Sequence, residues 1–357
     1  MSSSQRDNPL EALLHPFADG LLQWPEAGSV LFLRARGGAA LHAARLPGLA
    51  ATQPFRPEAA RLQRLGIDLL DEDALPEATY PLVLVLPPRQ REEARTLLAK
   101  ACAAVAPGGR VVASVANDEG AKSREADLKQ LARGSVSSLS KYHCRTFWTQ
   151  PDTACDKTLL SQWRQLDAPR RVSAQDVPGA GFLSRPGVFA WDRVDAASAM
   201  LAAVLPDDLR GRVADFGAGW GYLSMQVLTR CPRIASLDLF EADARALALA
   251  RRNLADAPAS GPDVPVAFHW HDVEAGVPGR FDAIVCNPPF HALGRGDRPD
   301  IGRAFIAAAA AALAPGGSLW LVANRHLPYE DALGTGFAQV RSVAQNGGFK
   351  IVHAVKA

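Results

Sequence analysis

The chain has 357 residues, 48% hydrophobic and 21% charged, which is enough for two domains with a core each and excludes a compositionally disordered chain. Its five cysteines are odd in number and form no Cys-x-x-Cys pair, so neither a disulfide framework nor a zinc site is expected, and the net charge of +2 alone says little about nucleic acid. No apolar run approaches the roughly 20 residues that cross a bilayer, and the N-terminus lacks a signal-peptide pattern. We therefore expect a cytoplasmic protein that binds no membrane.

The first half of the chain contains apolar runs typical of buried strands, joined by weaker helical patterns. The clearest runs stand at 29–35, 82–88 and 110–116. The last of them follows Ala-Pro-Gly-Gly, a pattern that ends a helix and restarts the chain as a strand.

A basic stretch with interleaved aromatic residues follows at 122–171. It holds ten Lys or Arg residues against five acids, and its aromatic residues are Tyr142, Phe147, Trp148 and Trp163. Such a stretch suits contact with the phosphates and bases of a nucleic acid, and we take Arg124 and Lys141 as candidate substrate contacts. A solvated face over a small core is the simpler explanation for any single residue here.

Residues 166–186 are rich in proline and glycine and have no strong period. Segments of this kind connect domains. We place the domain boundary there, with one domain over 1–170 and a second over 186–357.

Strand and helix patterns alternate through the second half. Apolar residues at helical spacing predict helices at 220–230, 243–257, 298–313 and 328–334, and short apolar runs predict strands at 212–219, 234–240, 264–270, 281–286, 317–324, 339–345 and 349–356. Such alternation is typical of an α/β fold in which a mainly parallel, doubly wound sheet carries helices on both faces.

Two landmarks occur twice in the chain. "VAPGGRVVASVAN" at 105–117 is matched by "LAPGGSLWLVAN" at 313–324. Upstream of each, a strand ends in Pro-Pro, within 80–90 and again within 281–291. Because the spacing is nearly constant, we predict an internal duplication that produces two tandem Rossmann-like domains.

The turn after the strand at 212–219 is rich in glycine, with Gly217, Gly219 and Gly221. Glycines let the chain turn sharply and let a ligand approach the bare backbone. Asp215, at the strand end, would repel a pyrophosphate but could accept hydrogen bonds from an ammonium group. This pattern disfavours a nicotinamide dinucleotide and favours a ligand with an amino-acid end.

Two further acids stand at the ends of the next two strands. Glu241 lies 20 residues past Gly221, where doubly wound sheets place an acid on ribose hydroxyls. Asp272 could accept from an adenine amine. Each acid alone could be a helix cap, but the set predicts S-adenosylmethionine as the cofactor, bound by Asp215, Gly217, Gly219, Gly221, Glu241 and Asp272.

The fourth strand ends in "CNPPFH", at the edge where such sheets bind ligands. A planar exocyclic amine is a poor nucleophile because its lone pair is delocalised into the ring. The Asn287 side-chain oxygen and the Pro288 carbonyl could accept its two N–H groups and hold the nitrogen toward a methyl donor. The prolines, including Pro289 as a substrate contact, stiffen this segment, and Phe290 offers a face for stacking. We take Asn287, Pro288 and Phe290 as catalytic.

The first half lacks these residues. Leu86 stands where Asn287 would be, Arg89 stands where Phe290 would be, and 32–40 keeps only two adjacent glycines. We therefore predict that the N-terminal copy is degenerate and that it grips substrate or supports the active copy.

Together, the glycine turn, Glu241, Asp272 and "NPPFH" resemble class I S-adenosylmethionine-dependent methyltransferases. A degenerate copy before an active one resembles the bacterial ribosomal RNA guanine-N2 methyltransferases, in detail over 185–357 and in architecture over 1–184. The resemblance implies an enzyme that methylates the N2 amine of a guanine in ribosomal RNA, with 16S favoured and 23S possible. It also places His291 near the base and Phe189 beside the cofactor, although ordinary packing is the simpler explanation for each.

Two other functions stay open. The same fold methylates protein glutamine or DNA adenine, against which Phe290 in place of Tyr and the duplicated architecture argue weakly. A non-catalytic ribosome assembly factor belongs to another class, and the intact Asn287 counts against it. As partners we expect ribosomal RNA or a ribosomal subunit, with neither membrane nor metal, and a monomeric protein.

Overall fold

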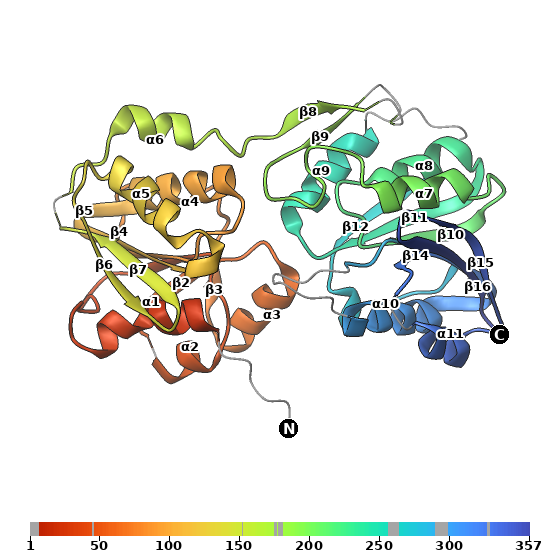
Figure 1. The fold of residues 1–357 in the computed structure, drawn as a ribbon, viewed down its shortest axis with the longest axis horizontal. Coiled ribbons are helices and arrows are strands. Elements are labelled where there is room, and N and C mark those ends of the chain that lie inside the picture. The colour runs from red at the N-terminus through yellow and green to blue at the C-terminus, as the bar shows by residue number, and fades with distance from the viewer. Residues whose placement is uncertain are drawn as a thin grey trace. The chain divides into compact units, whose positions relative to one another are not determined.

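The computed structural model describes residues 7–44, 46–151, 153–174, 177, 181–255, 264–289, 299–326 and 329–357. The chain divides into two compact units, Met1–Ala168 and Pro169–Ala357 (Figure 1). Within the described ranges no helix is long and apolar enough to cross a membrane.

The first unit is built on a seven-stranded sheet in the order β3-β2-β1-β4-β5-β7-β6. Its strands are β1 (Val30–Leu33), β2 (Leu49–Thr52), β3 (Asp68–Leu69), β4 (Tyr80–Val85), β5 (Val105–Ala116), β6 (Val136–Lys141) and β7 (Cys144–Thr149). Its helices are α1 (Asn8–Ala18), α2 (Ala39–Ala44), α3 (Arg56–Arg64), α4 (Arg91–Ala104), the 3-10 turn η1 (Asn117–Glu119), α5 (Ala121–Leu131) and α6 (Lys157–Trp163). β7 is antiparallel to β5 and β6, and the other pairs are parallel.

Successive side chains of β1 point to opposite faces of this sheet, and a hydrophobic core lies on each face. Leu31 and Leu33 pack in a cluster with residues of α4, α5 and α6. Val30 and Phe32 point the other way and pack in a cluster with residues of α1, α2 and α3. Because successive side chains of a strand face opposite sides, a fully apolar strand requires helices on both faces.

The second unit is built on a seven-stranded sheet in the order β12-β11-β10-β13-β14-β16-β15, with a separate β8-β9 hairpin. Its strands are β8 (Arg170–Ser173), β9 (Gly181–Ser184), β10 (Arg210–Phe216), β11 (Arg233–Glu241), β12 (Val266–Trp270), β13 (Phe281–Cys286), β14 (Leu313–Asn324), β15 (Gln339–Asn346) and β16 (Phe349–Val355). Its helices are α7 (Ala196–Val204), α8 (Tyr222–Arg230), α9 (Ala244–Ala255), the 3-10 turn η3 (Val273–Ala275), α10 (Pro299–Ala312) and α11 (Glu330–Gly336).

The two large sheets have the same strand order. In each sheet, the seventh strand in chain order lies between the fifth and the sixth and is antiparallel to both, as in β5-β7-β6 and β14-β16-β15. The prediction of two tandem, mainly parallel, doubly wound sheets is confirmed. The β6–β7 hairpin in the basic stretch was not predicted, because β6 is rich in serine and largely exposed, so it carries no clear apolar period.

The strand register brings the predicted site residues to one edge of the second sheet. Phe216, the last residue of β10, pairs with Cys286 of β13 on one side and with Phe240 of β11 on the other. The next residues along these three strands are Gly217, Asn287 and Glu241. They therefore emerge side by side at the carboxyl ends of parallel strands, where ligands bind in open α/β sheets.

Candidate active site

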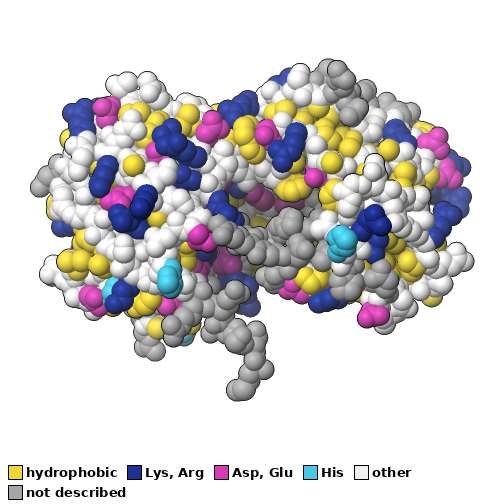
Figure 2. All heavy atoms as spheres, viewed as in Figure 1, with side chains coloured by type: hydrophobic (Ala, Val, Ile, Leu, Met, Phe, Trp, Pro, Cys, Tyr) yellow, Lys and Arg dark blue, Asp and Glu magenta, His cyan; other side chains and the backbone are white. Residues whose placement is uncertain are grey.

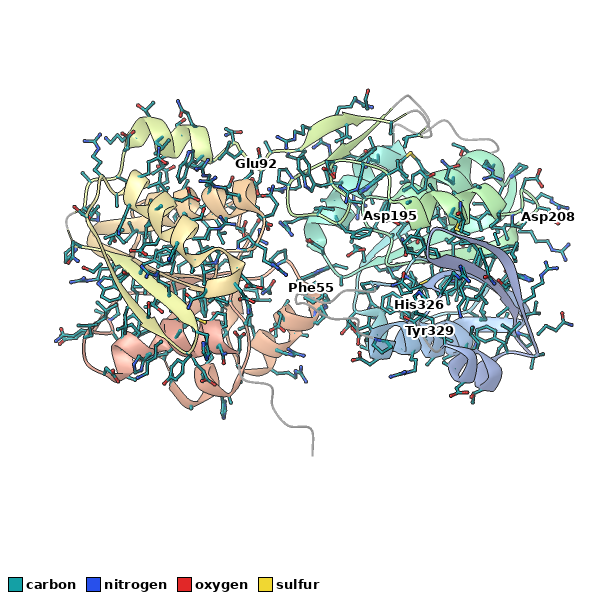
Figure 3. All side chains as sticks on the ribbon, in the orientation of Figure 1. Phe55, Glu92, Asp195, Asp208, His326 and Tyr329 are labelled. Carbon is teal, nitrogen blue, oxygen red and sulfur yellow. The ribbon has the colours of Figure 1, made fainter. Side chains whose placement is uncertain are left out.

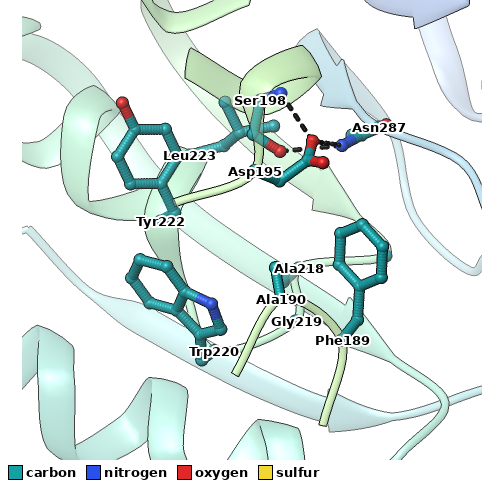
Figure 4. A pocket seen from close by; sticks show the side chains of 11 residues that line it. Phe189, Ala190, Asp195, Ser198, Ala218, Gly219, Trp220, Tyr222, Leu223 and Asn287 are labelled. Atoms are coloured by element: carbon teal, nitrogen blue, oxygen red, sulfur yellow. Dashed lines mark hydrogen bonds between the residues drawn. The ribbon is translucent and has the colours of Figure 1, made fainter. Parts of the chain in front are cut away.

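A pocket opens at this edge, wholly within the second unit (Figure 4). The glycine turn after β10 forms one wall, and the start of α7 and the tip of β13 form another. Its lining includes Phe189, Asp195, Ser198, Gly219, Trp220 and Asn287.

The glycines of the turn serve different purposes. Gly219 has a φ of +56° and lines the pocket, and a Cβ there would meet no atom within 4 Å. The open space beside it lets a ligand reach the backbone. Gly221 has a φ of +94°, and a Cβ there would lie 2.7 Å from Leu254 Cδ1, so this glycine allows α8 to pack closely on α9.

Glu241 stabilises the glycine turn. Its Oε2 accepts a hydrogen bond from the Gly219 N–H at 2.7 Å, and its Oε1 accepts one from the Asp243 N–H at 2.7 Å. Burial raises the pKa of Glu241 to about 7, against the opposing effect of these backbone donors. Each carboxylate oxygen keeps a further lone pair, so Glu241 can still accept hydrogen bonds from the hydroxyls of a ligand.

Asp215 lies beneath the turn and is completely buried. Ser224 Oγ donates to its Oδ2 at 2.7 Å, while its Oδ1 has no hydrogen-bond partner among the described residues. Burial raises the pKa of Asp215 to about 7. Asp215 does not line the pocket, so the predicted contact with an ammonium group stays a prediction.

Asp272 follows β12 and caps the 3-10 turn η3, where its side chain accepts from the Glu274 N–H at 3.0 Å. It is half-buried, so one oxygen remains available to a ligand. The predicted contact of Asp272 with an adenine amine stays a prediction, because the hydrogen bond to Glu274 does not involve a ligand.

Asn287 emerges from the tip of β13 with its amide group held from one side. Its Nδ2 donates to Asp195 Oδ2 at 3.0 Å and to Ser198 Oγ at 2.7 Å (Figure 4). Its Oδ1 is buried and has no hydrogen-bond partner among the described residues. Since an unsatisfied buried acceptor is costly, this oxygen points to a ligand that donates an N–H or O–H group.

The rest of the predicted motif is only partly described. Pro288 is buried and Pro289 is exposed. Phe290 and His291 lie outside the described residues. Phe189, by contrast, lines the pocket with 68% of its surface exposed. Its ring is therefore not part of a hydrophobic core and is open to a ligand.

Sequence comparisons show the family of the chain. The family model described as "Methyltransferase small domain" matches residues 179–353. A ribosomal RNA small subunit methyltransferase C from Shewanella baltica is 31% identical over 81% of this chain and 80% of its own length. A protein of the same name from Psychromonas ingrahamii is 28% identical over 78% of this chain and 77% of its own length. The chain belongs to the ribosomal RNA small subunit methyltransferase C family.

A solved structure resembles both units together. The 16S rRNA N2 methyltransferase of T. thermophilus, in complex with AdoMet and guanosine, matches 99% of this chain and 93% of its own length with a TM-score of 0.80. At 24% identity this likeness describes the fold. The class I methyltransferase fold with tandem domains, predicted from the sequence, is confirmed.

In this methyltransferase C family member, the first unit has an arginine where the glycine turn of the second unit begins. Leu33 pairs with Val85 as Phe216 pairs with Cys286, so Arg34 takes the position of Gly217. The Arg34 guanidinium donates to Glu72 Oε2 at 2.7 Å and to Glu93 Oε1 at 2.8 Å. These ion pairs therefore lie at the edge of the first sheet that corresponds to the glycine turn of the second.

The basic stretch of the first unit differs from its prediction. Arg124 is only 4% exposed and donates to the Arg89 carbonyl at 2.6 Å, so it does not have the surface position expected of an RNA contact. Phe147, Trp148 and Trp163 are buried as well. The stretch folds as α5, the β6–β7 hairpin and α6, which bury Phe147, Trp148 and Trp163 in the core, whereas Tyr142 at the hairpin turn is 37% exposed. Composition alone does not separate these positions.

Lys141 does lie at the surface, at the end of β6. The ammonium group of Lys141 is 5.9 Å from the centre of the Tyr142 ring. Figure 2 shows Lys and Arg side chains interspersed with Asp and Glu on the viewed face, without one continuous basic field.

Asp195 and Ser198 are site residues that the sequence analysis did not single out. Asp195, labelled in Figure 3, caps the start of α7, and its Oδ2 accepts from the Ser198 N–H at 2.9 Å. The pattern Asp-x-x-Ser before an apolar run is a recognisable N-cap signal. It predicts the helix start but not the contact with Asn287, which lies 92 residues further along the chain.

Proposed function

We propose that this chain transfers a methyl group from S-adenosylmethionine to the N2 amine of a guanine in 16S ribosomal RNA. The observation that carries the proposal is the Asn287 Oδ1, a buried acceptor with no hydrogen-bond partner among the described residues. Asn287 lines the pocket, and its Nδ2 is already held by Asp195 and Ser198.

The residues around the glycine turn fit the cofactor. Gly219 leaves open backbone at the pocket, and Glu241 offers carboxylate oxygens to ribose hydroxyls. Asp215 and Glu241 have raised pKa values because burial disfavours their charge, and a cationic ligand would offset that cost. S-adenosylmethionine, when bound, supplies an electrophilic methyl group on a positively charged sulfur.

Asn287 orients the amine that is methylated. Its Oδ1 accepts one N–H of the guanine amine and the Pro288 carbonyl accepts the other, which directs the nitrogen toward the methyl carbon. An amide cannot take up a proton at neutral pH, so Asn287 positions the substrate, and the proton that N2 loses after transfer passes to water. Phe290 supplies a stacking face in this proposal.

The first unit, residues 1–168, is proposed to bind RNA or to support the catalytic unit. The ion pairs of Arg34 lie where the second unit has its open glycine turn, which favours a role other than cofactor binding. Lys141 is the surface residue we propose for a phosphate contact. The names of the relatives, which specify the small ribosomal subunit, support 16S over 23S RNA.

Mass-spectrometric mapping of modified nucleotides tests the proposal. Ribosomal RNA from cells with and without the gene is compared, and the purified protein is then given the unmodified RNA. We expect one N2-methylguanine in 16S RNA to disappear with the gene and to be restored by the wild-type protein but not by Asn287→Ala. Unchanged ribosomal RNA, or methylation of DNA adenine or protein glutamine instead, contradicts it.

A further inference from the structure

We infer that Asp195 and Ser198, in the first turn of α7, are positioning residues that set the orientation of the Asn287 amide and thereby the rate of methyl transfer. This inference rests on the proposed function of Asn287. Asp195 and Ser198 do not take part in the chemistry in this account, because they act through the amide group between them and the substrate.

The contacts converge on one nitrogen. Asn287 Nδ2 lies 3.0 Å from Asp195 Oδ2 and 2.7 Å from Ser198 Oγ, so both of its N–H groups have acceptors (Figure 4). The Oδ1 is then left as the free end of the amide. An amide side chain has two orientations that differ by a half-turn about its last bond, and only this one offers an acceptor to the substrate.

Asp195 is the group that selects between the two orientations. An ionised carboxylate only accepts hydrogen bonds, so after a half-turn of the amide two oxygens would face each other at about hydrogen-bond distance without a proton between them. Ser198 does not discriminate in this way, because a hydroxyl both donates and accepts. The carboxylate is therefore expected to matter more than the hydroxyl.

Asp195 is itself held in place. The same Oδ2 that accepts from Asn287 also accepts from the Ser198 N–H at 2.9 Å, as the N-cap of α7. The helix behind it is anchored by buried Ala197 and Leu201. A carboxylate fixed by a packed helix can orient the amide without a rearrangement during the reaction, which is the condition for preorganised catalysis.

A simple N-cap would stabilise α7 but would have no effect specific to Asn287. Asp156 offers a matched control, because its side chain caps α6 by accepting from the Leu159 N–H at 3.0 Å and has no contact with the pocket. Asp195→Ala and Asp156→Ala each remove one cap of the same type.

The experiment measures single-turnover methyl transfer to 16S RNA from cells that lack the gene, together with the Kd for S-adenosylmethionine. Asp195→Ala is expected to slow transfer by about 10- to 100-fold, since a misplaced group can cost about two orders of magnitude, while the Kd stays unchanged. Asp195→Asn is expected to restore most of the rate, because the Ser198 N–H keeps an oxygen at the acceptor position. Asp156→Ala is expected to retain the wild-type rate.

A double-mutant cycle with Asn287→Ala separates positioning from independent effects. If Asp195 acts through Asn287, Asp195→Ala has little further effect once Asn287 is replaced. Ser198→Ala, which keeps the cap, provides a second variant if Asp195→Ala unfolds, and it is expected to show a smaller loss that also vanishes in the Asn287→Ala background. Wild-type rates in both variants, additive losses, or a weakened cofactor Kd that accounts for the loss would overturn the inference.

Failure of the proposed function gives a different result. In that case the wild-type protein transfers no methyl group to the RNA, or Asn287→Ala transfers it at the wild-type rate. An active wild type, an inactive Asn287→Ala and a fully active Asp195→Ala would reject only the positioning role.

Discussion

The Glu241 carboxylate binds the Gly219 backbone N–H at 2.7 Å, which ties the end of β11 to the glycine turn after β10. The same carboxylate is the proposed acceptor for the cofactor's ribose. In that proposal one side chain has two roles, so its removal should disturb both the glycine turn and cofactor binding.

Glu241→Ala is expected to weaken S-adenosylmethionine binding by about 10- to 100-fold, as the loss of charged hydrogen bonds predicts. Glu241→Gln is expected to weaken it as well, because one amide NH₂ would face the N–H of Gly219 or Asp243. Calorimetric titration measures both. Asp208→Ala, at an exposed pair with Arg233, is the control and should bind normally; full affinity in Glu241→Ala would contradict the assignment.

Gly221 and Gly219 are expected to respond differently to alanine. A Cβ at Gly221 would lie 2.7 Å from Leu254 Cδ1 and 3.2 Å from the Ala250 Cβ, so Gly221→Ala should lose about 1–3 kcal/mol of stability in urea unfolding. Gly219→Ala meets no neighbour and should lose less stability, yet it should weaken cofactor binding because the methyl group enters the pocket. Gly276→Ala, also at positive φ with open space, is the control. Equal stability losses at all three sites would refute this distinction.

The raised pKa of Asp215 predicts that stability and cofactor binding depend on pH. Its folded pKa of about 7 lies above the unfolded value near 3.8, so the folded protein holds more protons between these values and its free energy of unfolding falls as pH rises through that window. A cationic cofactor favours the ionised carboxylate, so binding should tighten from about pH 6 to about pH 8 with release of protons. Thermal unfolding and calorimetry in two buffers measure these effects. Asp215→Asn should reduce the slope of both profiles without abolishing it, because burial raises the pKa of Glu241 to about 7 as well. Unchanged profiles would show that Asp215 does not titrate here.

The ion pairs of Arg34 predict one cofactor per chain. Because the guanidinium and its carboxylates lie at the corresponding edge of the first unit, titration should give a stoichiometry of one, and a value of two would contradict this expectation. Arg34→Ala should cost about 3–5 kcal/mol in urea unfolding, since it removes one partner of the ion pair to Glu93, which is 3% exposed.

Lys141 lies at the surface of the basic stretch and Arg124 is buried, so charge reversal at these two residues should have different effects. Lys141→Glu should weaken RNA binding and lower the slope of log affinity against log salt by about one, while leaving circular dichroism unchanged. Arg124→Glu should instead unfold the first unit, because its buried guanidinium is replaced by a carboxylate near Asp127. Salt-dependent filter binding that is insensitive to Lys141→Glu would remove this residue from the RNA interface.

Much of the fold could be predicted from local pattern. Apolar runs ending in glycine or proline located β10 and β13, and the repeated Ala-Pro-Gly-Gly strands revealed the duplication. These signals are readable because strand length, alternation and turn residues are properties of short segments. The parallel arrangement then places Gly217, Glu241 and Asn287 at one edge, so the position of the site follows from the sequence as well.

The partners of individual side chains required the tertiary structure. Arg124 reads as a surface cation, yet packing of α5 buries it. Asp195 reads as a helix cap, yet the fold brings it to Asn287 across 92 residues. Burial and long-range hydrogen bonds depend on how whole elements pack against one another, and no short segment encodes that. The sequence by itself therefore determined which residues are candidates for the chemistry, and the tertiary structure decided that the start of α7 meets the tip of β13, where Asp195 and Ser198 bind the Asn287 amide.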